Sequence, residues 1–245
     1  MAQPDYLEVN GRRIAYRRRD GVSPALVFFP GYASDMEGAK AVAIDAFAGE
    51  RGLAMLRFDY SGTGSSSGEF AEGTLGRWID EALALIDRVI EGPLVLVGSS
   101  MGGWVAYQVA LRRGTRVRGI LGIAAAPDFT EWGFTDAQKA EIQDAGRLEE
   151  PNPYGPEPQL TTKAFWQSGQ QLLLGDRIAV ECPVRLVHGQ LDEDVPLAVA
   201  FRAMSALRSG DVQLLTIKGG GHRLSEPHEI DAILRTLSEL LEQVR

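Results

Sequence analysis

Leu94-Val95-Leu96-Val97-Gly98-Ser99-Ser100-Met101-Gly102 joins an apolar run to a Gly-x-Ser-x-Gly pattern. The four apolar residues are typical of a strand buried on both faces of a sheet, and residues 101–113 have the apolar spacing of a helix. A strand that turns sharply into a helix at this pattern forms a nucleophile elbow, which holds the serine hydroxyl above the sheet. We therefore expect an α/β fold with Ser100 as the candidate nucleophile.

The flanking sequence alternates further apolar runs with helical patterns. Runs that predict buried strands occupy residues 25–29, 53–58, 120–124, 184–187 and 212–217, and helical spacing marks residues 36–49, 78–89, 197–207 and 228–244. Residues 6–9 and 13–18 alternate around Asn10-Gly11, which predicts a hairpin with a type I′ turn. This order predicts a mostly parallel sheet with helices on both faces.

Length and composition narrow the class of protein. A chain of 245 residues with 44% hydrophobic and 24% charged residues suits one globular domain, residues 1–245. A formal charge of -8 disfavours binding to nucleic acid. Cys182 is the only cysteine, so neither an internal disulfide nor a cysteine-rich zinc site is available.

The chain contains no recognisable targeting or membrane segment. Residues 1–10 include Asp5 and Glu8 and lack an apolar run, and no later stretch approaches 18 uninterrupted apolar residues. The sequence therefore predicts a cytoplasmic protein without stable membrane association. It leaves the oligomeric state open.

Residues 128–177 interrupt the alternation. They show no strand pattern, a proline-rich stretch at 151–158 and short helical patterns at 136–147 and 161–174. We expect a lid-like helical insertion, in which nine acidic residues stand against four basic ones. Its aromatic residues either cover an apolar pocket or form the insertion's own small core, and they are Trp132, Phe134, Tyr154, Phe165 and Trp166.

A second Gly-x-Ser-x-Gly pattern occurs at Gly64-Ser65-Ser66-Ser67-Gly68. It follows another glycine turn and is not followed directly by a helical pattern, so the context of an elbow is missing. We interpret Ser66 as a loop serine.

A serine nucleophile needs a base and a carboxylate that orients this base. Of the three histidines, only His222 lies in a glycine-rich loop after the last strand, and we interpret His188 and His228 as structural. Asp192 and Asp194 both follow Ser100 and precede His222, which is the order serine, acid, histidine of hydrolases with a nucleophile elbow. We take Asp192 as the preferred acid and Asp194 as the reserve.

An oxyanion hole takes one backbone N–H from the residue after the serine, here Met101. The turn Phe29-Pro30-Gly31-Tyr32 suits the second donor, which we expect to be the Tyr32 N–H. Trp104, one turn into the nucleophile helix, either lines an acyl pocket with Trp132 and Phe134 or serves packing.

These residues resemble the α/β-hydrolase family over nearly the whole chain. More narrowly, the sequence is similar to the small hydrolases that include palmitoyl-protein thioesterases and esterases of mycophenolic acid acyl-glucuronide. The strings that carry the resemblance are Pro30-Gly31-Tyr32, Arg57-Phe58-Asp59-Tyr60-Ser61-Gly62, Thr74-Leu75-Gly76-Arg77-Trp78, Val97-Gly98-Ser99-Ser100-Met101-Gly102-Gly103-Trp104, His188-Gly189-Gln190-Leu191-Asp192-Glu193-Asp194-Val195-Pro196 and His222-Arg223.

The resemblance implies an eight-stranded sheet, a triad of Ser100, Asp192 and His222, and hydrolysis of small-molecule or protein-borne acyl esters or thioesters, including depalmitoylation, without metal or cofactor. The insertion at residues 132–158 matches less clearly than the core. A peptidase or a carbon-carbon bond hydrolase with the same triad remains an alternative, as does a catalytically silent relative that only binds ligand.

Overall fold

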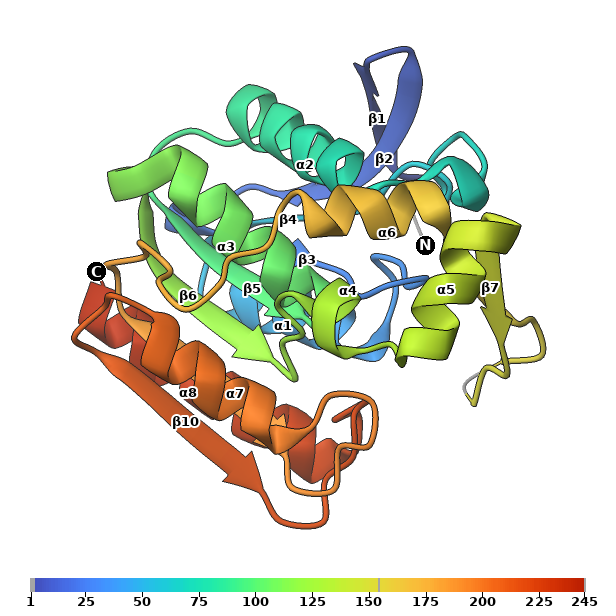
Figure 1. Cartoon of the computed structure of the whole chain (residues 1–245). Helices are drawn as coiled ribbons and strands as arrows, with labels where there is room; N and C mark the ends of the chain where they lie inside the picture. Colours follow the sequence, from blue (N-terminus) through green and yellow to red (C-terminus); the bar gives the residue numbers. More distant parts are fainter. Residues whose placement is uncertain (1–2, 154, 245) are drawn as a thin grey trace.

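The computed structural model describes residues 3–153 and 155–244 and has an eight-stranded sheet at its centre (Figure 1). The strands of this sheet are β1 (Asp5–Val9), β2 (Arg12–Arg19), β3 (Val22–Phe29), β4 (Leu53–Phe58), β5 (Leu94–Ser99), β6 (Val117–Ile123), β9 (Val184–Gly189) and β10 (Val212–Ile217). They lie in the order β1-β2-β4-β3-β5-β6-β9-β10. β2 is antiparallel to β1 and β4, and the other pairs are parallel. The predicted sheet is confirmed, except that β10 is an edge strand without a buried residue, whereas its apolar run predicted a buried strand.

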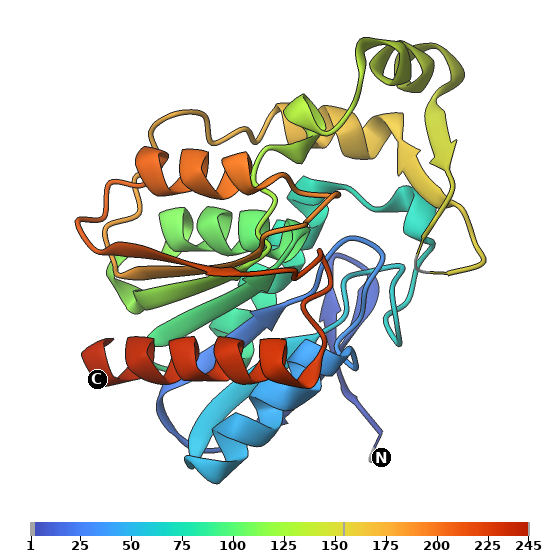
Figure 2. The same ribbon diagram turned by 90° about the horizontal axis from the view of Figure 1, so that it is seen from below.

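Helices cover both faces of the sheet (Figure 2). One face carries α1 (Ala39–Glu50) and α8 (Pro227–Val244), and the other carries α2 (Leu75–Val89), α3 (Met101–Arg113) and α7 (Leu197–Ala206). The short 3-10 helices η1 (Phe70–Glu72) and η2 (Gly114–Arg116) lie in the connections.

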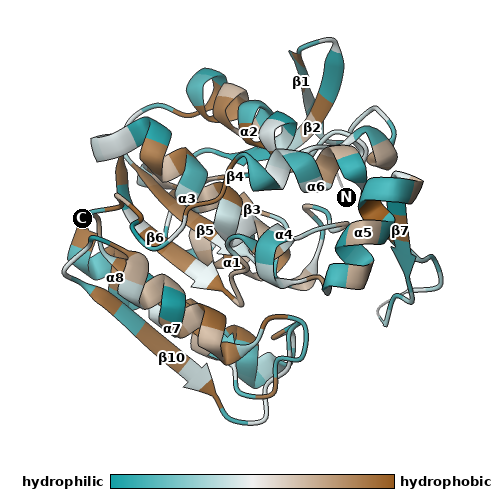
Figure 3. Ribbon diagram, viewed as in Figure 1, coloured by the Kyte–Doolittle hydropathy of each residue, from teal (hydrophilic) through white to brown (hydrophobic). Residues whose placement is uncertain are grey.

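Alternating side chains of the central strand β5 enter two separate apolar clusters. Leu94 and Leu96 pack with the cluster that includes Trp78 on α2, whereas Val95 and Val97 pack with the cluster that includes Leu237 on α8. The central strands are accordingly brown in the hydropathy colouring, and much of α5 (Asp136–Ala145) is teal (Figure 3). Burial on both faces explains why these strands read as unbroken apolar runs.

The expected absence of strands from residues 128–177 is wrong. This segment contains α4 (Phe129–Trp132), α5, the hairpin of β7 (Arg147–Glu150) and β8 (Gln159–Thr162), and α6 (Lys163–Gln170). Each strand has four residues, and only Leu148 and Thr161 in the two strands are buried, which leaves too little apolar alternation to recognise. Tyr154 lies outside the described residues.

Hydrogen bonds tie the two ends of this segment together and join it to the rest of the domain. At its two ends, the Asp128 carboxylate accepts the backbone N–H groups of Leu174 at 2.8 Å and Gly175 at 3.0 Å. The Leu172 carbonyl also accepts from Trp104 Nε1 at 3.2 Å and from Gln108 Nε2 at 2.6 Å, both on α3. The segment is thus fastened to α3, the helix that directly follows Ser100.

Candidate active site

Ser100 occupies the turn between β5 and α3. Its φ of 55° and ψ of -122° are unusual for a residue with a side chain. The surrounding backbone holds this conformation, because the Ser100 N–H donates to the Ile123 carbonyl at 2.9 Å and the Ser100 carbonyl accepts from Ala126 N–H at 3.0 Å. A Cβ on Gly98 or Gly102 would lie 2.3 Å from the Gly102 oxygen or 2.1 Å from the Phe29 oxygen, so the turn requires glycine at both positions.

Three of the predicted site residues come together above the sheet. The Ser100 hydroxyl lies 3.0 Å from His222 Nε2, and His222 Nδ1 lies 2.9 Å and 3.1 Å from the two carboxylate oxygens of Asp192. These residues follow β5, β9 and β10. Because the strands are parallel, their carboxyl ends meet at one edge of the sheet, which brings the three residues together.

The carboxylate of Asp192 is fully buried, with no exposed side-chain surface. Its Oδ1 atom accepts the backbone N–H groups of Asp194 at 3.1 Å and Val195 at 2.8 Å. These donors compensate the cost of burying a charge and fix the orientation of the carboxylate. Asp194 itself, the reserve acid, has an exposed side chain and contributes its backbone to this site.

Ser66 of the second Gly-x-Ser-x-Gly pattern has different partners. Its hydroxyl accepts from Ala15 N–H at 2.8 Å and donates to the Asp59 carbonyl at 2.8 Å. The hydroxyl thereby joins β2 to the loop after β4. This is the arrangement of a structural loop serine.

The loop that carries the predicted oxyanion donor Tyr32 packs directly against the nucleophile. A Cβ on Gly31 would lie 3.4 Å from the Ser100 Cβ. Met101, which would supply the other N–H, is the first residue of α3. The N-terminal N–H groups of a helix have no partner within the helix, and the helix dipole favours negative charge at this end.

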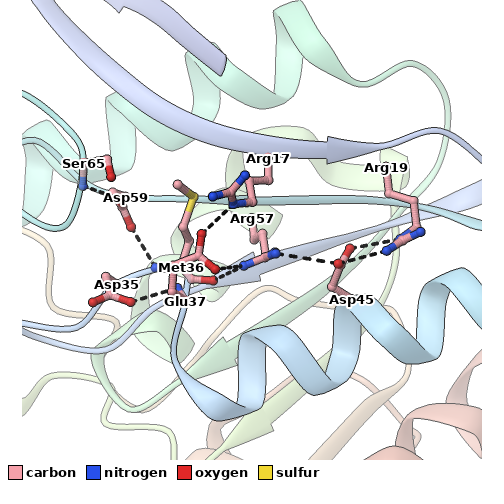
Figure 4. A network of polar contacts seen from close by, with 9 residues as sticks. All are labelled: Arg17, Arg19, Asp35, Met36, Glu37, Asp45, Arg57, Asp59 and Ser65. Carbon is pink, nitrogen blue, oxygen red and sulfur yellow. Dashed lines mark hydrogen bonds and ion pairs between the residues drawn. The ribbon is translucent and has the colours of Figure 1, made fainter. Parts of the chain in front are cut away.

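A buried polar network anchors the segment after Tyr32 to the end of β4 (Figure 4). The Asp59 carboxylate accepts Met36 N–H at 2.7 Å and Ser65 N–H at 2.7 Å, and Arg57 Nη1 donates to the Met36 carbonyl at 2.6 Å. Burial raises the pKa of Asp59, and these two N–H donors oppose that rise. We assigned Asp59 no role from the sequence, although it lies in one of the strings that resemble the family.

The side chain of Tyr32 packs within a group of aromatic rings. Its ring centroid lies 4.7 Å from that of Phe165, 5.1 Å from Phe70 and 6.1 Å from Phe129. Its hydroxyl donates to the Leu160 carbonyl of β8 at 2.5 Å. The same residue therefore contacts the nucleophile turn with its loop and residues 128–177 with its ring.

The three predicted pocket residues differ in exposure. Trp104 is fully buried and packs against the ring of Phe129 at a centroid distance of 5.7 Å. Trp132 and Phe134 are half-buried. Trp132 packs against the small cluster of Ala126, Val195 and Val199.

Lys40 on α1 contacts the loop of His222, a feature that sequence reasoning missed. Its Nζ atom donates to the carbonyl of Arg223. Burial and the nearby Arg223 charge lower the pKa of Lys40 to about 8, against a smaller opposing effect of Glu229. Within residues 3–153 and 155–244, the structure places no three His, Cys, Asp or Glu side chains where they could hold a metal ion.

The comparisons with known proteins give the family. A protein-family model described as the alpha/beta hydrolase family matches residues 26–234, so the chain belongs to this family. This confirms the fold and the hydrolase class expected from the sequence. The chain is 38% identical to mouse "Palmitoyl-protein thioesterase ABHD10, mitochondrial" over 94% of this chain and 80% of the relative. The human protein of the same name is 36% identical over 94% of this chain and 77% of the relative.

Two solved structures agree closely with the fold. The structure of mouse alpha/beta hydrolase domain-containing protein 10 has a TM-score of 0.92 at 36% identity, with both chains covered completely. A putative hydrolase from Agrobacterium vitis S4 has a TM-score of 0.90 at 36% identity, with 97% of each chain covered.

The cytoplasmic location expected from the sequence is contradicted, because the mouse and human relatives are both named mitochondrial. The composition of residues 1–10 was therefore a poor guide to location. No helix in the described part of the chain combines the length and apolarity needed to span a membrane.

Proposed function

We propose that this chain hydrolyses carboxylic esters and thioesters through Ser100, His222 and Asp192. The observation that carries the proposal is the continuous path from the Ser100 hydroxyl through the His222 imidazole to the buried Asp192 carboxylate, with contacts of 3.0 Å and 2.9 Å. This geometry suits removal of the serine proton by His222 while Asp192 fixes the imidazole tautomer. The Tyr32 and Met101 N–H groups are the oxyanion donors of the proposal.

The proposed reaction has two acyl-transfer steps. His222 takes the Ser100 proton as the oxygen attacks the carbonyl carbon, and the two N–H groups stabilise the negative oxygen of the tetrahedral intermediate. His222 then gives its proton to the departing alcohol or thiol, which leaves an acyl group on Ser100. In the second step His222 activates water, which releases the carboxylic acid and restores the serine.

For the substrate, we propose an apolar acyl group on a thiol or alcohol, carried by a protein or a small molecule. The names of the mouse and human relatives, palmitoyl-protein thioesterases, support a thioester of a long acyl chain. The aromatic group around Tyr32 and Phe165 supports an apolar lining beside the nucleophile turn. We further propose that the chain forms one domain, residues 1–245, in which residues 128–177 act as a lid over the acyl site.

A substrate panel with one acyl chain tests this proposal. The purified protein is assayed on a matched thioester, ester and amide, with chains from acetyl to palmitoyl. We expect turnover of the thioester and ester, little of the amide, and kcat/KM that rises with chain length, because each buried methylene contributes up to about 0.8 kcal/mol. Preference for the amide or for a carbon-carbon bond substrate would favour the alternative enzyme classes.

A fluorophosphonate probe tests whether the chain is a catalytically silent relative. Labelling of the wild type and loss of labelling in Ser100→Ala are expected for an activated serine. A folded wild type that neither labels nor turns over any substrate would overturn the proposal.

A further inference from the structure

His188 is a buried histidine that the proposed reaction does not use. It lies near the end of β9, and only 2% of its side chain is exposed. The fully buried carboxylate of Asp192 follows four residues later in the chain. A polar side chain in such a place requires hydrogen-bond partners, and these partners indicate what it does.

The protonation of His188 follows from one contact. Its Nε2 atom lies 2.8 Å from the backbone carbonyl oxygen of Val195. A carbonyl only accepts hydrogen bonds, so Nε2 carries the proton and donates. The same Nε2 atom lies 3.4 Å from Asp192 Oδ2, while its hydrogen bond goes to Val195.

Val195 closes this arrangement into a ring. Its carbonyl accepts from His188, while its N–H donates to Asp192 Oδ1 at 2.8 Å. The Asp192 carboxylate therefore receives Val195 N–H at one oxygen and faces His188 Nε2 with the other. His222 Nδ1 contacts both oxygens, at 3.1 Å and 2.9 Å, from the remaining direction.

We propose that His188 is a positioning residue for Asp192: it fixes the 192–195 turn through the Val195 carbonyl, and this turn holds the Val195 N–H that donates to Asp192 Oδ1. The inference rests on the proposed function, because Asp192 has this importance only if it orients the catalytic base. The carboxylate is shielded from water, so solvent does not replace the Val195 N–H if the turn shifts. A carboxylate that rotates out of place orients His222 less well.

The experiment compares His188→Leu with His188→Gln. Glutamine retains an N–H donor at the end of its side chain, whereas leucine retains only volume. We expect His188→Leu to lower kcat by about tenfold or more with KM changed by less than about twofold, and His188→Gln to recover most of the loss. The matched control is His228→Leu, which removes an exposed histidine and should leave kcat unchanged.

A double-mutant cycle separates positioning from a general effect on folding. In an Asp192→Asn background, His188→Leu should cause much less further loss than in the wild type, because the residue acts through that carboxylate. Unfolding in urea is measured for each variant, and His188→Gln carries the test if His188→Leu does not fold. Equal losses in the Leu and Gln variants, or full additivity with Asp192→Asn, would overturn the inference. Full activity of Asp192→Asn alone would instead overturn the proposed triad.

Discussion

The Nε2 atom of His222 lies 3.0 Å from the Oγ atom of Ser100, across a sequence separation of 122 residues. Each residue stands in a loop at the carboxyl end of a strand, β10 for His222 and β5 for Ser100. β6 and β9 lie between these two strands in the sheet. The contact therefore depends on correct formation of half the sheet.

Replacing each candidate nucleophile separates the two Gly-x-Ser-x-Gly patterns. We expect Ser100→Ala to abolish ester and thioester hydrolysis with the fold intact, because the contact with His222 is lost. Ser66→Ala should change turnover by less than about threefold but lower the free energy of unfolding by about 1–3 kcal/mol, since it leaves the Ala15 N–H without its partner. Turnover and urea unfolding are measured for both variants. An inactive Ser66→Ala protein with normal stability would contradict the assignment.

The acid is tested by two asparagine substitutions. Asp192→Asn should lower kcat by roughly 10³ to 10⁴, as expected when the carboxylate that orients a catalytic histidine is lost. Asp194→Asn should have a far smaller effect, because the contact of Asp194 with Asp192 comes from its backbone N–H, which the substitution retains. Steady-state kinetics on one ester measures both. A larger loss in Asp194→Asn would move the acid two residues along the chain.

The acidic residues of the insertion predict that the protein distinguishes thioesters by the charge of their leaving group. Residues 128–177 contain nine acidic and four basic residues, so they should repel the phosphates of an acyl-coenzyme A thioester more than a neutral thioester of the same chain. Added salt should narrow the difference, since salt screens exposed charges. The measurement is kcat/KM for both thioesters at low and high ionic strength. A preference for the coenzyme A thioester at low salt would refute the electrostatic argument.

The lowered pKa of Lys40 predicts that the free energy of unfolding depends on pH in the alkaline range. Its pKa is lowered to about 8 in the folded protein from an ordinary value of 10.5. Between these values the unfolded chain binds more protons at this group than the folded chain, so its contribution to the free energy of unfolding rises as pH increases. Compared with Lys40→Met, the wild type should therefore gain stability from pH 8 to pH 10.

Urea unfolding across this pH range measures the effect, and Lys218→Met, which removes an exposed lysine, is the control. A constant stability difference between the wild type and Lys40→Met at all pH values would show that the lysine does not titrate in this window.

The sequence predicted the elements of the sheet because strands buried on both faces consist of consecutive apolar residues. Strands such as β5 lie between two helical layers, and their unbroken apolar runs record this. The hairpin turn was equally visible, since Asn10 and Gly11 have the positive φ angles, 49° and 77°, that this dipeptide favours. β7 and β8 are short and mostly polar, so no apolar run or alternation marks them in the sequence.

The sequence by itself determined which residues could supply the chemistry. A single glycine-flanked serine follows an apolar run directly into a helix, and one histidine follows the last strand in a glycine loop. Such patterns reflect local backbone requirements, because a Cβ at Gly98 or Gly102 would collide with neighbouring backbone. Only the tertiary structure decided how Asp192, Val195 and His188 share their hydrogen bonds, how Tyr32 reaches β8 and how Lys40 meets the loop of His222. The Tyr32 and Lys40 contacts join segments distant in the chain, and the bonds of His188 depend on the exact path of the 188–195 turn. Their geometry depends on the twist and packing of the whole sheet, which no local pattern encodes.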